Sequence, residues 1–484
     1  MPLQYAVTGG LSAVESGLRV TSRGLALGVT GMQATMQGFE ASRRSLDLFV
    51  EDPLLVTEAP RATDIVLTTA PVVTGIARDQ RRETSSAQRE RRGQQIRSAF
   101  TDLGPAFVKL GQTLSVRPDL VPEEYIDALE ELQDQVPPAP WDRVEAVIED
   151  ELGPVDEVFD DFEREPLAGA SLGQVYRAEL DGEPVAVKVR RPDIEARVQR
   201  DLRLVESAVP VASAFLDDGR AFTLETIVDQ FADTLREELD YEREAEVMEQ
   251  VRANFADDDR VKVPAAVDSH TTGRVLTMEY VDGTKISEHG ALDSMAIDRA
   301  DLANRLRETY LQMTLVDGVF HADPHPGNVA VQPDGTLVLY DFGMAGELDP
   351  DVQADIVDFF VAISQGDVTA ILEALVELGT LDPAAAETGD DALGEVVERF
   401  VERTRAGEFD AQEFEALVDA LEEAFYEMPF RLPPNLALVL RVIAITDGVA
   451  NTLDPEHDFF GVIDDVLADR GFLDEDATES AIEA

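Results

Sequence analysis

The stretch that decides the fold is His321–Asn328, which reads HADPHPGN, followed by Asp341-Phe342-Gly343. Asp323 precedes Asn328 by five residues, and Asp341 follows Asn328 by thirteen, across a predicted β-hairpin. Phosphoryl transfer on a kinase-type lobe requires a carboxylate facing the acceptor, with an Asn and an Asp as Mg²⁺ ligands. The spacing therefore predicts Asp323 as the catalytic carboxylate and Asn328 and Asp341 as the metal ligands.

A second element, Val185-Ala186-Val187-Lys188, lies on the second strand of a predicted hairpin that turns at Asp181-Gly182. Only four of the 40 basic residues are lysines, and a compact ammonium suits pairing with phosphate and with a glutamate. Lys188 is therefore predicted to contact nucleotide phosphates and to pair with a glutamate on a later helix. Glu238 is the favoured partner. The alternatives on that helix are Glu237, Glu242 and Glu244.

Composition excludes several classes of site. The chain has 484 residues, a length that predicts about two to four domains, and 44% of them are hydrophobic. Cysteine is absent, which excludes disulfides, zinc ribbons, iron–sulfur clusters and a thiol nucleophile. Ninety-eight acidic residues against 40 basic ones give a net charge of −58. Such a surface does not favour nucleic acid, because no basic stripe remains to contact phosphates.

The acidic excess resembles that of cytoplasmic proteins from salt-accumulating halophilic archaea. In multimolar salt the Debye length falls below about 3 Å, so self-repulsion is screened while carboxylates keep the surface hydrated. Disorder is the alternative for an acidic chain, but the apolar content and clear periodicity favour a folded protein. Most acidic residues are thus expected to be solvent-facing.

The first hundred residues differ from the rest. They contain ten acidic and twelve basic residues, a net charge of +2, which leaves −60 for residues 101–484. This segment is expected either to be buried against the rest of the chain or partly disordered, or to form a peripheral surface for membrane lipid or a quinone intermediate. No signal peptide is expected, because the first charged residue is Glu15 and no basic region precedes an apolar core. No transmembrane span is expected either, since the apolar stretch Leu436–Thr446 is interrupted by Arg441. We therefore expect a cytoplasmic protein, which would lie peripherally on the inner face of the membrane if its first hundred residues form such a surface.

The order of β-rich and helical segments predicts an α+β, bilobal fold. Two helices end at the Pro137–Pro140 cluster, strands flank Asp181-Gly182, and a long helical insert follows. Nothing in the pattern specifies an oligomeric state. The predicted organisation is an N-terminal segment over 1–75, a helical extension over 76–150, a β-rich lobe with inserted helices over 151–283, a helical lobe over 284–455 and an acidic tail over 456–484.

Four motifs together resemble those of the UbiB-type atypical kinases, the aarF-domain family. They occur in the family's order: Lys109–Gln112 (KLGQ), Leu167–Gln174 (LAGASLGQ), Glu238-Leu-Asp240 and HADPHPGN. The resemblance covers roughly residues 60–455. It implies a bilobal protein-kinase-like fold with an N-terminal helical extension carrying a KxGQ motif, and ATP or ADP with Mg²⁺ as cofactors.

The resemblance also implies roles for individual residues. Lys109 and Gln112 would occupy the groove where a protein substrate docks, and Asp240 would complete an ExD motif with Glu238. The backbone at Glu279 and Val281 would read adenine. The loop over the nucleotide would consist of Ala168, Gly169, Ala170 and Ser171. Gly169 replaces a usual alanine there and permits closer approach to phosphate, which puts the family's unusual nucleotide preference in doubt.

Three functions fit these residues. The first is an ATP-dependent kinase-like enzyme that supports isoprenoid quinone or lipid metabolism through ATP hydrolysis or phosphotransfer. The second is a small-molecule kinase of the aminoglycoside or choline kinase type, which would lack the Lys109–Gln112 extension. The third is a nucleotide-gated scaffold without turnover, disfavoured because Lys188, Asp323, Asn328 and Asp341 are all present.

Overall fold

The computed structural model separates into two compact units. The first comprises Met1–Gly111, Asp127–Glu131 and Ala196–Asp233, and the second comprises Gln112–Ile126, Leu132–Glu195 and Thr234–Ala484. The structure describes residues 60–61, 63–65, 67–68, 86–114, 125, 128–129, 132, 138–169, 172–213, 218–295, 297–381, 433–455 and 459–473.

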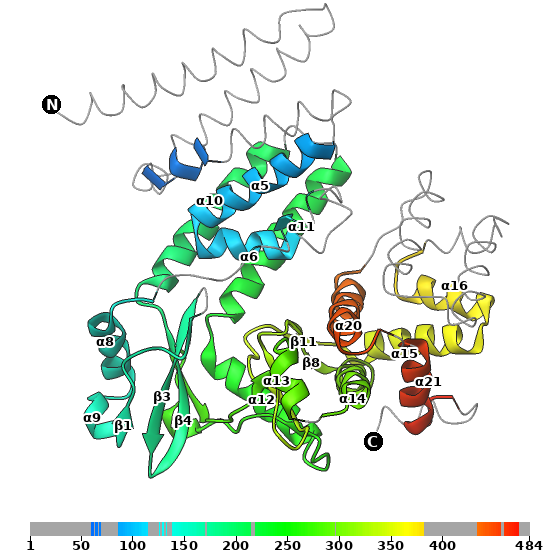
Figure 1. Cartoon of the computed structure of the whole chain (residues 1–484). Coiled ribbons are helices and arrows are strands. Elements are labelled where there is room, and N and C mark those ends of the chain that lie inside the picture. Colours follow the sequence, from blue (N-terminus) through cyan, green and yellow to red (C-terminus); the bar gives the residue numbers. More distant parts are fainter. Residues whose placement is uncertain are drawn as a thin grey trace, which may run out of the picture. The chain divides into compact units, whose positions relative to one another are not determined.

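The first unit is helical where it is described (Figure 1). A positive φ of 99° at Gly104 allows the sharp turn between its first two long helices. Arg61 binds the buried carboxylate of Asp201 through two hydrogen bonds of 2.7 and 2.8 Å, and also donates to the Leu103 carbonyl. The helices are α5 (Ser86–Leu103), most of α6 (Pro105–Leu114), and parts of α10 (Ile194–Ser213) and α11 (Asp218–Glu237).

The β-rich lobe of the second unit is built on the predicted Asp-Gly hairpin. Asp181 and Gly182 have φ angles of 52° and 80°, which the turn requires, and the prediction is confirmed. The hairpin joins β3 (Gly173–Leu180) to β4 (Glu183–Arg190). The remaining strands of this antiparallel sheet are β1 (Asp161–Phe162) and β2 (Ala168–Gly169) on β3, and β6 (Val275–Glu279) on β4.

Helix α8 (Trp141–Glu151) covers this sheet with its buried Val144 and Ile148, and the short α9 (Val155–Val158) follows it (Figure 1). On the sheet side, Tyr176 and Val187 are fully buried against them. Helix α12 (Tyr241–Asn254) enters the main core of the unit instead. The sheet is thus held on a rigid apolar layer, which fixes the position of the Lys188-bearing strand.

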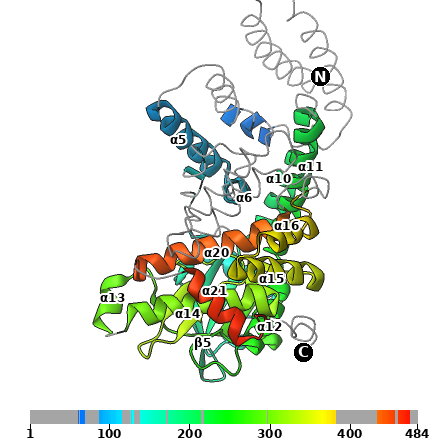
Figure 2. The same ribbon diagram turned by 90° about the vertical axis from the view of Figure 1, so that its right-hand side faces the viewer.

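The helical lobe is built around α14 (Arg299–Leu311), which continues as the π-helical turn Gln312–Asp317 and ends at Gly318, with a φ of 67°. Figure 2 shows α20 beside α14, where the buried Arg307 donates to Asp447 at 2.8 Å. The other helices are α13 (His289–Ser294), α15 (Pro350–Gln365), α16 (Val368–Glu377), α20 (Pro434–Leu453) and α21 (Phe459–Asp469), with the short 3₁₀ turn Asp268–His270 in the other lobe.

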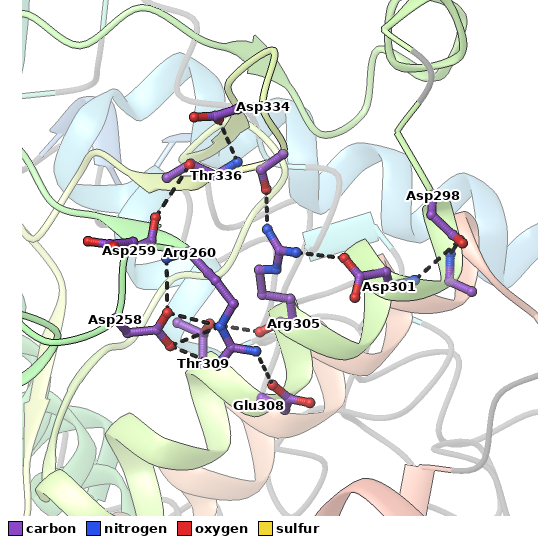
Figure 3. Close-up of polar contacts among 12 residues, drawn as sticks. Asp258, Asp259, Arg260, Asp298, Asp301, Arg305, Glu308, Thr309, Asp334 and Thr336 are labelled. Carbon is purple, nitrogen blue, oxygen red and sulfur yellow. Dashed lines mark hydrogen bonds and ion pairs between the residues drawn. The ribbon is translucent and has the colours of Figure 1, made fainter.

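The second predicted hairpin is also confirmed. It joins β9 (Val329–Val331) to β10 (Leu337–Leu339), and Gly335 at its turn has a φ of 91°. Arg305 on α14 donates to the Gly335 carbonyl and to Asp301, and so fastens the turn to the helix (Figure 3). The shorter strands around it are β5 (Val261–Lys262) on β10, β7 (Thr284–Lys285) on β9, and the pair β8 (Val319–His321) and β11 (Ala345–Glu347).

A second ion-pair group fastens the start of β5 to the same helix. Arg260 pairs with Asp258 at 2.8 Å and with Glu308 on α14 at 3.2 Å (Figure 3). β5 is hydrogen-bonded to β10, so both strands of this edge are tied to α14. The hairpin that separates Asn328 from Asp341 is therefore anchored at both its turn and its outer edge.

Two C-terminal helices bear on the expectations from the sequence. The predicted acidic tail contains α21, whose Val462, Ile463 and Leu467 are buried because they repeat at helical spacing on one face. Among the described helices, Asn435–Leu453 is long and apolar enough to cross a membrane, although half of it is buried inside the unit. Length and composition alone are weak evidence for a span, and the buried pair of Arg307 with Asp447 is typical of a core helix.

The π-helical turn yields a prediction of pH-dependent stability. Burial raises the pKa of Asp317 from 3.8 to about 6, and Arg470 and Gln312 offset this only in part. Because the pKa of Asp317 is higher in the folded than in the unfolded state, protonation of this carboxyl favours folding. The resulting stabilisation is fully present below pH 3.8 and is lost as the pH rises through about 6. Asp317→Asn should therefore unfold at higher urea than wild type at pH 7, by about 1–2 kcal/mol in free energy, with the difference vanishing near pH 4.

Urea unfolding followed by circular dichroism between pH 4 and 8 measures this difference. The exposed Asp465 supplies the control variant Asp465→Asn, which should follow the wild-type curve. A difference in unfolding free energy between Asp317→Asn and wild type that is the same at every pH would contradict the prediction.

Candidate functional site

The site centres on Lys188, which the middle of the sheet presents to the core. Lys188 is paired in register with Val175 on β3 and Leu276 on β6, and it is 7% exposed. Its ammonium contacts both oxygens of Glu244, at 2.6 and 2.9 Å, and Oδ1 of Asp341 at 3.0 Å. One buried cation thus joins the β-rich lobe, helix α12 and the segment after β10.

The partner of Lys188 is Glu244, so the predicted pairing with Glu238 is wrong. Asp240 is the N-cap of α12 and accepts hydrogen bonds from the backbone N–H groups of Glu242 and Arg243. Glu238 precedes this cap and therefore lies outside the helix that faces Lys188. Glu244 lies in its first turn, in phase with the buried Tyr241, Met248 and Val251. That helical phase was the sequence signal that distinguishes Glu244 from the neighbouring acidic residues.

The charges of this cluster follow from its burial. Burial would lower the pKa of Lys188, but Asp341 and Glu244 raise it well above its ordinary value, so the side chain stays an ammonium. Burial raises the pKa of Glu244 despite the neighbouring Lys188. For Asp341, burial is outweighed by Lys188 and by the Gly343 N–H, which donates at 2.9 Å, and its pKa lies below the ordinary range. Asp341 is thus the firmly ionised carboxylate of the two.

The second half of the site is the loop after β8. Asn328 donates through its side-chain amide to Asp323, at 3.1 Å to Oδ2 and 3.2 Å to the carbonyl. Its backbone N–H donates to the His325 carbonyl, and Nδ1 of the His325 ring accepts from the Gly327 N–H. The loop is therefore braced by its own residues, and it holds Asp323 and Asn328 together as the sequence spacing predicts.

A buried histidine links the two halves. His321 lies on β8 opposite Ala345 on β11, and the next residue donates its N–H to the Met344 carbonyl. The ring of His321 contacts the Tyr310 hydroxyl at 2.8 Å and packs edge-on against Phe342 at 5.3 Å between centroids. Burial lowers the pKa of His321, so it is a neutral packing residue. It fixes the segment of Asp341 against the loop of Asp323.

Residues predicted to contact the nucleotide base and phosphates are only partly described. Ala168 and Gly169 form the exposed strand β2, whereas Ala170 and Ser171 lie outside the described residues. Glu279 ends β6 and pairs with Lys262 at 2.7 Å. The Val281 carbonyl accepts from the Tyr340 hydroxyl at 3.0 Å. This contact ties the predicted adenine-reading segment to the residue before Asp341.

The donor set suits a metal that is partly coordinated by a substrate. Among the described residues, no three His, Cys, Asp or Glu side chains cluster as a metal site. Mg²⁺ needs no such cage, because one or two carboxylates with phosphate oxygens and waters complete its coordination. The Asp341 side chain is 38% exposed, and Asn328 turns its amide nitrogen to Asp323, which leaves its amide oxygen for a ligand. These two residues therefore fit a nucleotide-bound Mg²⁺.

The KLGQ residues lie on α6. Lys109 belongs to the first unit, while Gln112 belongs to the second and donates to the Leu132 carbonyl at 3.1 Å. Their predicted role in the substrate groove stays a prediction.

Comparisons with known proteins place this site in a family. A model of the ABC1 atypical kinase-like domain matches residues 131–375. An uncharacterized Synechocystis protein, sll0095, is 38% identical over 77% of this chain and 66% of its own length. Protein ACTIVITY OF BC1 COMPLEX KINASE 8, chloroplastic, of Arabidopsis thaliana is 37% identical over 74% of this chain and 51% of its own. The chain thus spans about half to two thirds of the length of these relatives.

A solved structure shows the same fold. The Rv3197–erythromycin complex from Mycobacterium tuberculosis superposes with a TM-score of 0.53 over 74% of this chain and 91% of that chain, at 24% identity. The predicted α+β kinase-like fold is confirmed, and the chain belongs to the ABC1 atypical kinase-like family, as the UbiB-type resemblance predicted.

Proposed function

We propose that the chain is an atypical kinase-like enzyme that binds Mg²⁺-ATP and either hydrolyses it or transfers its phosphoryl group to a small lipid-like acceptor. The observation that carries the proposal is the buried Lys188 ammonium held between Glu244 and Asp341. A buried cation that bridges two lobes to a partly exposed carboxylate is the arrangement that phosphate positioning needs. Membership of the ABC1 atypical kinase-like family supports kinase-type chemistry.

Each residue then has a distinct task. Lys188, oriented by Glu244, contacts the α- and β-phosphates. Asp341 and Asn328 hold Mg²⁺, which when bound neutralises charge on the phosphates. Asp323, steadied by Asn328, orients an acceptor hydroxyl or a water toward the γ-phosphate and accepts its proton. The backbone of Glu279 and Val281 contacts adenine.

The acceptor and setting extend the proposal. We place the enzyme in isoprenoid quinone or lipid metabolism, with the first hundred residues as its contact to membrane lipid, and in a salt-rich cytoplasm. The low acidic content of that segment supports the contact, and the charge of −58 supports the salt. Lys109 and Gln112 would keep protein substrates from the groove.

Nucleotide binding tests the proposal. Calorimetric titration of ATP and of ADP into the protein in multimolar KCl should show binding that Mg²⁺ strengthens by about tenfold or more. Lys188→Met should weaken that binding by about tenfold to a hundredfold, because a charge-assisted contact to phosphate is lost. Lys285 is exposed on β7 and supplies the control variant Lys285→Met, which should bind as wild type does.

Two outcomes would contradict the proposal. One is nucleotide affinity that is the same in Lys188→Met as in wild type. The other is an affinity that Mg²⁺ does not change.

A comparison of Gly169→Ala with wild type separates ATP from ADP preference. A Cβ at this position should weaken the binding of ATP more than that of ADP if the glycine admits the γ-phosphate.

A further inference from the structure

Tyr241 lies beside the charged cluster but has no part in the proposed chemistry. It is the first residue of α12, three residues before Glu244, and is 1% exposed. The Lys188 ammonium lies 5.2 Å from the centroid of its ring. Its buried hydroxyl makes no hydrogen bond to any described residue. The ring thus contacts the Lys188 ammonium, whereas the buried hydroxyl lacks the hydrogen bond that would offset the cost of removing it from water.

The hydroxyl lies against Gly173, the first residue of β3. A Cβ built on Gly173 would be 2.2 Å from the Tyr241 hydroxyl oxygen, whereas the next atoms are the Val189 carbonyl at 3.4 Å and Cζ of Tyr241 at 3.5 Å. Gly173 is absent from the described glycines with positive φ, so its backbone suits any residue. The lack of a side chain at this position is therefore a matter of space, and the Tyr241 hydroxyl occupies that space.

These contacts connect two parts of the nucleotide site. Gly173 directly follows the LAGASL segment that is predicted to cover the nucleotide, and β3 is hydrogen-bonded to the Lys188 strand. The aromatic face of Tyr241 attracts the Lys188 ammonium, and burial raises the pKa of Tyr241, which keeps the ring a neutral phenol. Tyr241 cannot swing aside, because it belongs to the main buried core.

We propose that Tyr241 is a positioning residue of the nucleotide site. Its ring supports the Lys188 ammonium, and its hydroxyl sets the distance between the start of β3 and helix α12. This inference rests on the proposed nucleotide function. It also gives Gly173 a role, because the absence of a side chain there leaves room for the Tyr241 hydroxyl. It also predicts that substitutions at the two positions compensate each other.

A double-mutant cycle tests the contact with Gly173. Gly173→Ala should weaken ATP binding by about tenfold, because the Cβ pushes β3 away from the tyrosine hydroxyl. Adding Tyr241→Phe removes that oxygen and should restore the affinity of the double variant to within about threefold of wild type. Gly273 supplies the matched control Gly273→Ala, since a Cβ there meets no atom within 4 Å.

The second arm tests the ring. Tyr241→Leu should weaken ATP binding by about threefold to thirtyfold through loss of the cation–π contact, whereas Tyr241→Phe keeps the ring and should retain most of the affinity. Thermal unfolding is measured in parallel. A residue with only a packing role would lower the unfolding temperature of Tyr241→Leu while the folded protein bound ATP as wild type does, and that result would overturn the inference.

The wild-type titration separates the role of Tyr241 from the proposed nucleotide function. Wild type that binds Mg²⁺-ATP, with Gly173→Ala no weaker than Gly273→Ala or not rescued by Tyr241→Phe, would overturn the role of Tyr241 and leave the proposed function intact. Wild type that binds no nucleotide would overturn both.

Discussion

Asp341→Asn should abolish Mg²⁺-dependent phosphate release from ATP, with a fall in kcat of about 10³-fold or more. The carboxylate is the ionised partner of Lys188, and its exposed portion is the proposed metal ligand. Asparagine keeps the shape and can still accept the hydrogen bond from Gly343, so the fold should be retained. The loss is therefore expected in turnover, with the circular dichroism spectrum unchanged.

The assay compares this variant with Asp351→Asn, a substitution of the same type at an exposed position on α15. The control should turn over ATP as wild type does. Wild-type turnover by Asp341→Asn would contradict the assignment of Asp341 to the metal.

Glu244→Gln should lower kcat/KM for ATP by about 10²-fold, because the charge-assisted contact that orients the Lys188 ammonium becomes a neutral hydrogen bond. Both carboxylate oxygens of Glu244 lie within 2.9 Å of the Lys188 Nζ, whereas Asp341 contacts it through one oxygen. Glu242→Gln provides the matched control, since Glu242 is exposed on the same helix turn.

A third variant compares the two candidate partners of Lys188. Steady-state kinetics of Glu238→Gln should show a smaller loss than Glu244→Gln. A Glu244→Gln enzyme with wild-type kcat/KM, combined with an inactive Glu238→Gln enzyme, would restore the pairing that the sequence first suggested.

The site was readable from the sequence where covalent spacing controls geometry. Asp323 and Asn328 share one short loop, and the hairpin between Asn328 and Asp341 has turn residues that specify it, so their convergence followed from the chain itself. The Asp181-Gly182 turn fixed Lys188 on its strand in the same way. These are local rules, and excess surface charge does not disturb them.

The partner of Lys188 depended on where a helix begins. Six acidic residues occur between positions 237 and 246, and acidic character alone separates none of them in a chain with 98 carboxylates. Asp240 caps α12, and this start sets Glu244 on the inner face. Tyr241 was missed for a related reason, because its contact with Gly173 joins segments that are remote in sequence. The helix α21 was hidden by its acidic outer face, although its apolar residues repeat at helical spacing.

The most direct measurement is inorganic phosphate release from ATP by the purified chain in multimolar KCl. It is made with Mg²⁺, with EDTA, and with or without vesicles of archaeal-type lipid. Turnover that requires Mg²⁺, is lost in Asp341→Asn and rises with lipid is the predicted result. Bound nucleotide without phosphate release under every condition would contradict enzymatic turnover and favour a nucleotide-gated scaffold.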